Sequence, residues 1–265
     1  TRFWQLDALG VRVRRFIEVD QPEVVACKCA AVRAQHALLK ALPEGINCLD
    51  SSGIRSPASG YTLAAADICD CVQLESALSI GGWESALPTL LIAECVLAYL
   101  EPEAAEALLQ WFAHRASYIV FVSYEQIGPH DAFGRMMMHN LRKRQCPLLG
   151  LPACPDVKAQ VDRCKRSGWD RAASEDLLVL YCKALGAAER TRVERLERLD
   201  EIEEWELMLR HYCMVLAVRE RTEKGVAFFD DLELLAPIAG SFPIGLESLH
   251  DAVTTDPTLH RPSLN

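Results

Sequence analysis

The chain has 265 residues, of which 50% are hydrophobic and 25% charged, a composition that excludes a disordered or fibrous protein. Its 28 lysines and arginines against 37 acidic residues give a net charge of −9, so the chain as a whole is not drawn to nucleic acid. No apolar run reaches the roughly 20 residues of a membrane span, which excludes a membrane-spanning protein.

The first half of the chain alternates short apolar strands with helices. The sequence predicts strands over 15–20, 61–70, 89–93 and 118–126, and helices over 22–42, 72–80 and 102–116. Strands that are apolar throughout and separated by helices are typical of a parallel sheet covered on both faces. We therefore expect an α/β fold with a Rossmann-like sheet.

The second half is predicted to be mostly helical. Apolar residues follow helical spacing from 128 to 210, and a strand over 211–219 returns to the sheet. The last stretch is rich in Pro, Ser and Thr and is expected to be loose. The expected organisation is a partial core (1–127), a helical insertion that caps the substrate (128–210), returning core strands (211–236) and a loose tail (237–265).

Acidic residues stand where four successive strands end. They are Asp20, Asp67, Glu94 and Glu125. Ligands of open α/β sheets bind at the carboxyl ends of the strands, so four acids in register predict a binding site. The alternative is a set of solvated acids that interact with the dipoles of the following helices.

The position of each acid predicts a separate contact with a cofactor. Asp20 ends the strand whose acid typically accepts hydrogen bonds from a ribose diol. Asp67 is placed to accept from an adenine amine, while the backbone amide of Ile68 binds a ring nitrogen. Glu94 lies between them and faces the cofactor. Because acids repel a pyrophosphate, this crevice favours S-adenosylmethionine, with its sulfonium and ammonium groups, over a dinucleotide.

Several stretches of the chain resemble the leucine carboxyl methyltransferase family. They are 15-RFIEVDQPEVV-25, 89-TLLIAECVLAYL-100, 123-SYEQIGPHDAFGRMM-137, 140-NLRKRQC-146 and 200-DEIEEWELMLRHYC-213. The resemblance runs from Thr1 to about Arg219. It implies an S-adenosylmethionine-dependent enzyme that methylates the C-terminal leucine carboxylate of type-2A protein phosphatase catalytic subunits.

The resemblance also implies roles for individual residues. Asp20, Asp67, Ile68 and Glu94 would contact the cofactor, and the substrate pocket would be lined by Tyr99, Tyr124, Glu125 and Gln126. Family members carry substrate-binding helices, a carboxylate-binding arginine, a first strand and a Gly-rich turn ahead of the Thr-x-Phe-Trp segment. Here that segment opens the chain, and no G-x-G occurs. We expect a truncated relative whose 265 residues, taken alone, have little activity.

The expected reaction requires no catalytic acid or base. A peptide carboxyl group has a pKa near 3.5, so at neutral pH it is already the nucleophile. Catalysis would consist of positioning the carboxylate oxygen, the methyl carbon and the sulfur in line. We expect the phosphatase to meet a basic edge of the helical insertion, formed by Arg135, Arg142, Lys143 and Arg144.

Two other functions stay open at this stage. The sister branch of the family methylates wybutosine in transfer RNA, and the segments Pro-His-Asp-Ala-Phe-Gly and Glu-Glu-Trp-Glu lean towards it. A nucleic-acid substrate would require more basic surface than this acidic chain offers. The other alternative is an inactive relative that binds phosphatase without methylating it.

The cysteine pattern bears on the compartment of the protein. The chain has 11 cysteines but no C-x-x-C pair, which favours reduced thiols and no metal site. No signal peptide opens the chain. We therefore expect a cytoplasmic monomer that does not associate with membranes.

Overall fold

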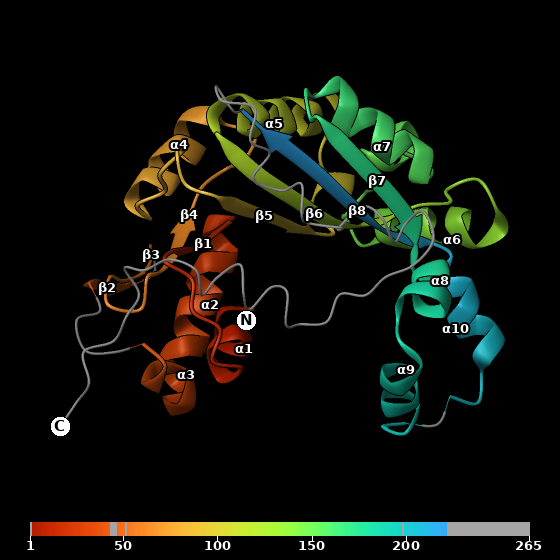
Figure 1. Cartoon of the computed structure of the whole chain (residues 1–265), viewed down its shortest axis with the longest axis horizontal. Helices are drawn as coiled ribbons and strands as arrows, with labels where there is room; N and C mark the ends of the chain where they lie inside the picture. Colours follow the sequence, from red (N-terminus) through yellow and green to blue (C-terminus); the bar gives the residue numbers. More distant parts are fainter. Residues whose placement is uncertain (1, 43–46, 51, 198, 222–265) are drawn as a thin grey trace. The chain divides into compact units, whose positions relative to one another are not determined.

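A computed structural model describes residues 2–42, 47–50, 52–197 and 199–221 (Figure 1). The chain divides into two compact units at the junction between Glu84 and Ser85. Each unit contains a four-stranded sheet with helices packed against it. This arrangement confirms the expected α/β class.

The sheet of the first unit has the strand order β1-β4-β3-β2. Strand β1 (Phe16–Asp20) is parallel to β4 (Tyr61–Ala65). Strand β3 (Gly53–Ser56) is antiparallel both to β4 and to β2 (Asn47–Asp50), so β2 and β3 form a hairpin that the sequence did not predict.

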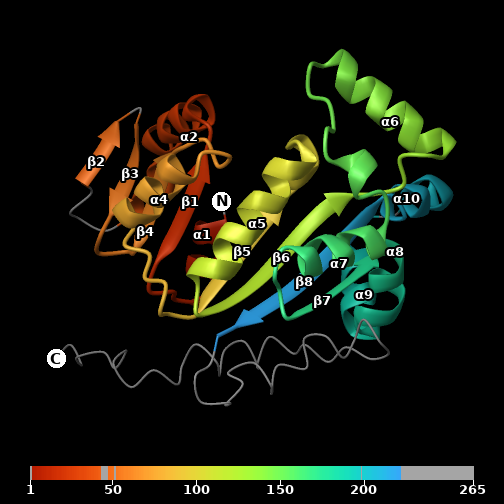
Figure 2. The ribbon, with the colours of Figure 1, turned by 90° about the horizontal axis from the view of Figure 1, so that it is seen from above.

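Helices cover both faces of this first sheet. The unit contains α1 (Arg2–Ala8), α2 (Pro22–Ala34), α3 (His36–Lys40) and α4 (Cys71–Ile80). Helix α2 packs with Tyr61 and Leu63 of β4, whereas Ala77 of α4 packs with Ala64. Because successive strand residues point to opposite faces, α2 and α4 lie on opposite sides of the sheet, as Figure 2 shows.

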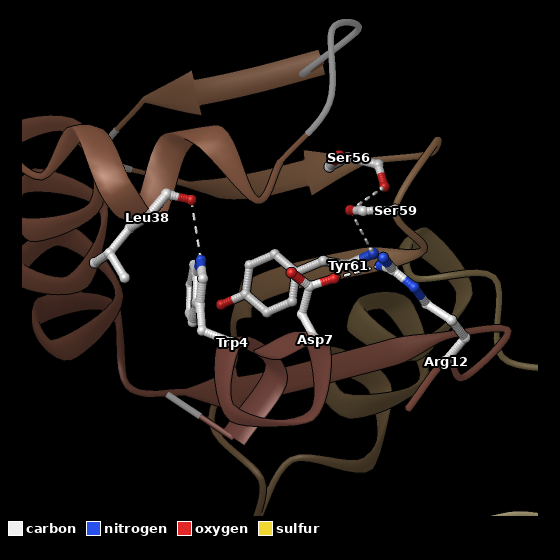
Figure 3. Close-up of polar contacts among 7 residues, drawn as sticks. All are labelled: Trp4, Asp7, Arg12, Leu38, Ser56, Ser59 and Tyr61. Carbon is white, nitrogen blue, oxygen red and sulfur yellow. Dashed lines mark hydrogen bonds and ion pairs between the residues drawn. The ribbon is translucent and has the colours of Figure 1, made fainter. Parts of the chain in front are cut away.

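Aromatic rings close the core of the first unit. The Tyr61 ring lies 4.6 Å from that of Phe3 and 5.1 Å from that of Trp4, measured between ring centroids. The Trp4 Nε1 donates a hydrogen bond to the Leu38 carbonyl oxygen at 3.0 Å, as Figure 3 shows. This hydrogen bond joins helices α1 and α3 beside the start of β4.

The sheet of the second unit has the strand order β5-β6-β8-β7. Strand β5 (Thr89–Glu94) is parallel to β6 (Tyr118–Gln126). Strand β8 (Tyr212–Glu220) is antiparallel both to β6 and to β7 (Arg171–Asp176). The predicted strands over 89–93, 118–126 and 211–219 are thus confirmed within a residue or two.

The remaining elements of the second unit are helical. They are η1 (Leu97–Tyr99), α5 (Pro102–Arg115), α6 (Ala132–Lys143), η2 (Leu151–Ala153), α7 (Val157–Arg166), α8 (Leu177–Val179), η3 (Leu180–Ala184), α9 (Ala187–Glu194) and α10 (Ile202–Leu209). Figures 1 and 2 show α5 and α7 on the same face of the sheet. Ile119 and Phe121 of β6 are fully buried within this unit.

The prediction that 128–210 is helical throughout is wrong over Arg171–Asp176. This segment is strand β7, and α7 packs against β7 and β8 as part of the core. The sequence Arg-Ala-Ala-Ser-Glu-Asp holds no β-branched or aromatic residue. Its strand conformation comes from pairing with the edge of β8, which overrides local propensity. The predicted tail over 237–265 lies outside the described residues.

Candidate functional site

The structure places the four strand-end acids in two pairs, one in each unit. Asp20 ends β1, and Asp67 follows the neighbouring parallel strand β4 by two residues. Glu94 ends β5, and Glu125 lies near the end of the neighbouring parallel strand β6. Each pair therefore stands at the carboxyl end of two parallel strands of its own sheet, whereas one sheet had been expected to carry all four acids. Glu125 is buried, so its carboxylate does not line an open pocket as expected.

Asp20 and Asp67 present exposed carboxylates at the edge of the first sheet. The Ala66 N–H donates to the Asp20 carbonyl oxygen at 3.0 Å and joins the two strand ends. One Asp20 carboxylate oxygen accepts from the Gln21 N–H at 2.8 Å, and one of Asp67 accepts from the Cys69 N–H at 2.9 Å. A carboxylate has further acceptor positions, so this edge fits a ligand rich in donors, such as a nucleoside with a diol and an amine. Ile68 is half-buried in the same turn.

Strand β5 ends in a sharp turn immediately after Glu94. Cys95 has a φ of 53°, a left-handed conformation that is uncommon outside glycine. The Cys95 N–H donates to the Tyr124 carbonyl oxygen at 2.7 Å and fixes this turn to β6. Burial, followed by the charges of Glu125 and Glu94, raises the pKa of the Cys95 thiol to about 11. The thiol is therefore neutral at physiological pH and is not a nucleophile.

Glu125 is buried and holds the turn that follows β5. The residue is 1% exposed. The carboxylate accepts from the N–H groups of Leu97 at 3.2 Å and Ala98 at 3.1 Å. It also accepts from the Ser123 hydroxyl at 2.7 Å. Burial is the largest effect and leaves the pKa of Glu125 above its usual value. The Ser123 hydrogen bond, the Arg163 charge and the two N–H groups each lower it in part. Glu125 thus positions η1, the element that carries Tyr99.

Three tyrosines and one glutamine lie near the carboxyl ends of β5 and β6. They are Tyr99, Tyr124, Tyr212 and Gln126. The rings of Tyr124 and Tyr212 stack with centroids 5.0 Å apart and planes 13° apart. The Gln126 side chain lies beside that of Tyr212. Its oxygen Oε1 is buried, and the described part of the chain supplies no donor to it. Burial raises the pKa of Tyr99 and Tyr212, and that of Tyr124 to about 12.

These phenols keep their protons at neutral pH and can donate hydrogen bonds. The Cys95 N–H bonds the Tyr124 carbonyl oxygen, the Tyr124 ring stacks on that of Tyr212, and Tyr99 lies in η1, which follows the Cys95 turn. Such a group suits a substrate that carries a carboxylate, because the oxygens of a carboxylate accept from O–H donors. Sequence reasoning missed Tyr212. The antiparallel pairing of Tyr212 with Gln126 brings Tyr212 to the carboxyl end of β6. No local sequence pattern predicts which residues of β6 and β8 pair.

The predicted basic edge lies on helix α6. Arg142 and Lys143 end the helix, Arg144 follows it, and all three side chains are exposed. The opposite face of α6 packs through Met137, Met138 and Leu141 against a small core formed by Ala98, Leu148 and Leu151. The cluster is thereby presented by a helix whose apolar side is anchored.

Among the described residues, no group of three or more His, Cys, Asp or Glu side chains could hold a metal ion. No described helix combines the length and apolar character that crossing a bilayer demands.

Comparisons with known proteins agree on one family. The sequence model of leucine carboxyl methyltransferases matches residues 1–113. Leucine carboxyl methyltransferase 1 of Bos taurus is 36% identical over 228 residues, which cover 85% of this chain and 68% of that protein. Its homologue from Arabidopsis thaliana is 36% identical, covering 83% of this chain and 66% of that protein. The tRNA wybutosine-synthesizing protein 4 of Homo sapiens is 35% identical, covering 92% of this chain and 36% of that protein. Among solved structures, PigF with SAH aligns with 81% of this chain at a TM-score of 0.44 and 11% identity.

Proposed function

The chain belongs to the leucine carboxyl methyltransferase family, and we propose that it methylates the C-terminal leucine carboxylate of a type-2A protein phosphatase catalytic subunit, acting as a cytoplasmic monomer. The observation that carries the choice of a carboxylate substrate is the group of tyrosine hydroxyls at the carboxyl ends of β5 and β6, where the Tyr124 and Tyr212 rings stack with centroids 5.0 Å apart and η1 carries Tyr99. The net charge of −9 favours a protein substrate over transfer RNA.

The described residues would contribute binding and orientation. S-adenosylmethionine supplies an electrophilic methyl group on its sulfonium. In the first unit, Asp20 and Asp67 accept hydrogen bonds from the nucleoside part. The phenols hold the substrate carboxylate, which is ionised at neutral pH and attacks without a general base.

A methyl-transfer assay tests this function. Because the 265 residues taken alone are expected to have little activity, the assay uses this chain joined to the family's N-terminal strand and Gly-rich turn. Labelled S-adenosylmethionine is incubated with that protein and with purified phosphatase catalytic subunit, a subunit lacking its terminal leucine, or wybutosine-containing transfer RNA. The proposal expects base-labile label on the intact subunit alone. Label that persists without the terminal leucine, or that enters transfer RNA, would overturn the substrate assignment.

Asp20→Asn is expected to weaken S-adenosylmethionine binding by about 5–150-fold, the loss typical of one charged hydrogen-bond partner. The substitution replaces one acceptor oxygen at the end of β1 by a donor amide. Calorimetry measures the affinity. Asp70→Asn is the matched control, because Asp70 caps α4 and asparagine caps helices equally well. Equal affinities for both variants would remove Asp20 from the cofactor site.

Arg142→Glu combined with Arg144→Glu is expected to raise the KM for intact phosphatase and to leave the affinity for S-adenosylmethionine unchanged. The basic cluster would steer an acidic partner surface, so its effect should fade as salt rises through about 0.1 M, where the Debye length is about 10 Å. Lys158→Glu with Lys165→Glu on α7 gives the same charge change elsewhere and serves as the control. Wild-type kinetics for the α6 variant at low salt would make the cluster an ordinary solvated surface.

A further inference from the structure

Two residues of the Asp, Glu, Lys and Arg type are buried in the part of the chain that the structure describes. They are Glu125, which is 1% exposed, and Arg163, which is 4% exposed, and both belong to the second unit. An ionised side chain that is buried without an opposite charge strongly destabilises a fold. A guanidinium group keeps its proton in proteins, so the charge of Arg163 requires compensation inside this core.

Both residues lie on the same side of the second sheet. Successive strand residues alternate between the two faces, so Phe121 and Glu125 of β6 share one face. The Phe121 ring lies 5.6 Å from the ring of Trp169, measured between centroids, and the Trp169 N–H bonds the Cys164 carbonyl oxygen at the end of α7. Arg163 is on the buried face of α7, which packs against β7 and β8. The two charged side chains therefore share the layer between α7 and the sheet.

Cys213 of β8 is within electrostatic reach of both charges. It pairs with Glu125 in the ladder of β6 and β8. Burial raises the pKa of the Cys213 thiol to about 12, and the Ser174 hydrogen bond lowers it in part. The Glu125 charge raises the same pKa further, whereas the Arg163 charge lowers it. One side chain thus experiences both charges, which places them close together in this layer.

Hydrogen bonding alone does not explain the burial of Arg163. Its Nη2 donates to the Gln160 Oε1 at 2.6 Å, and Gln160 is buried in the same helix. The amide fixes the guanidinium but supplies no negative charge. The Arg163 Nε is buried, and the described residues offer it no acceptor. The compensation for this charge is therefore electrostatic, and Glu125 is the buried group of opposite sign.

We propose that Arg163 is the counter-charge of Glu125 and, through that carboxylate, a positioning residue for η1. The carboxylate accepts from the N–H groups of Leu97 at 3.2 Å and Ala98 at 3.1 Å, and η1 ends with Tyr99. An ionised carboxylate accepts at both oxygens, whereas a protonated one carries an O–H group on one of them. Arg163 therefore favours the form that holds both N–H groups. The consequence for substrate binding by Tyr99 rests on the proposed function.

The other titratable groups around Glu125 are neutral at neutral pH. They come from the turn after β5, from η1, from the segment before α7 and from β8, and they are Cys95, Tyr99, Cys154 and Cys213. Burial is the largest effect on each of them and raises its pKa, so all four keep their protons. The charged group that acts on Glu125 is Arg163.

Infrared spectroscopy measures the protonation of Glu125 directly. Its carbonyl band in the acid form is identified by the loss of that band in Glu125→Gln. Arg163→Met removes the positive charge but keeps a long side chain, so the band should persist to a pH about one unit or more higher than in the wild type. Arg166→Met is the matched control, because this exposed guanidinium lies on the same helix and pairs with Glu106. It should titrate as the wild type does. Identical titration of Arg163→Met and the wild type would overturn the proposal.

A double-mutant cycle of melting temperatures supplies an independent readout. Arg163→Met should lower the melting temperature by about 5–10 °C in the wild type and by less than half as much in the Glu125→Gln background, where no carboxylate needs a counter-charge. Equal losses in both backgrounds would contradict the pairing. If Arg163→Met alone does not fold, a folded double variant supports the proposal, and a double variant that also fails to fold refutes it.

The link to the substrate is measured on the chain joined to the family's N-terminal strand and Gly-rich turn. Arg163→Met should raise the KM for the phosphatase subunit by about 3–10-fold, the loss of one hydrogen bond, and leave the affinity for S-adenosylmethionine unchanged. Arg166→Met should change neither. An unchanged KM beside a shifted carboxyl titration would remove the positioning role. The infrared and melting measurements need no substrate, so they succeed or fail independently of the proposed function.

Discussion

Replacing Glu125 with alanine is expected to lower the free energy of unfolding of the second unit by about 3–5 kcal/mol. The carboxylate accepts from the N–H groups of Leu97 and Ala98 and from the Ser123 hydroxyl, and all of these groups are buried. Alanine would leave the two N–H groups unsatisfied, at about 1–3 kcal/mol each when buried without a partner, whereas the Ser123 hydroxyl can donate to the Ala93 carbonyl oxygen at 3.2 Å. Denaturant unfolding followed by tryptophan fluorescence measures the loss.

Two variants separate hydrogen bonding from general sensitivity at this position. Glu125→Gln keeps the volume of the side chain and one acceptor oxygen, so it should cost about 1–3 kcal/mol, less than alanine. Glu204→Ala, at an exposed position of α10, should stay within about 0.5 kcal/mol of the wild type. If Glu125→Ala unfolds at the wild-type denaturant concentration, the carboxylate does not hold η1.

The strand ends show which features of the fold the sequence predicts. Apolar runs that end in acids locate β1, β5 and β6 almost to the residue. The burial on both faces that such runs suggest holds for most of β6 but not for β5, where Leu90 and Ile92 are 58% and 47% exposed. The pattern does not say where the side chains point. Tyr124 and Glu125 are neighbours and face opposite sides of the sheet, so one enters the tyrosine group and the other enters the core.

Contacts between distant segments are what the sequence leaves undetermined. Strand β7 and the hairpin of β2 and β3 exist through pairing with other strands, and their own residues have weak strand propensity. The side chains of Asp131 and His211 lie 2.9 Å apart, although the two residues are 80 positions apart in the sequence. A histidine beside a strand and an aspartate before a helix are each common, and only the fold makes them partners.

The other large effect is expected in the first unit, around Tyr61 at the start of β4. Its ring is fully buried, and its hydroxyl donates to the Glu18 carboxylate on β1. The Lys28 ammonium of α2 lies 2.6 Å from the same carboxylate. Burial raises the pKa of Glu18, but the hydrogen bonds from Lys28 and Tyr61 outweigh it, so the pKa lies below its usual value. One tyrosine therefore joins the aromatic core to a half-buried ion pair.

Tyr61→Ala is expected to lower the free energy of unfolding of this unit by about 3–5 kcal/mol, because it opens a ring-sized cavity and removes a donor from Glu18. Tyr61→Phe keeps the ring and should cost about 1.5–3 kcal/mol, the contribution of a hydrogen bond to a charged group. Because the pKa of Glu18 is lowered, this part of the stability is present above the usual carboxyl range and is lost as the pH falls through the lowered value. Urea unfolding across pH should thus show the Tyr61→Phe difference shrinking in acid, whereas the cavity contribution to Tyr61→Ala persists. A Tyr61→Phe difference that is unchanged in acid would show that the phenol does not stabilise the ionised carboxylate.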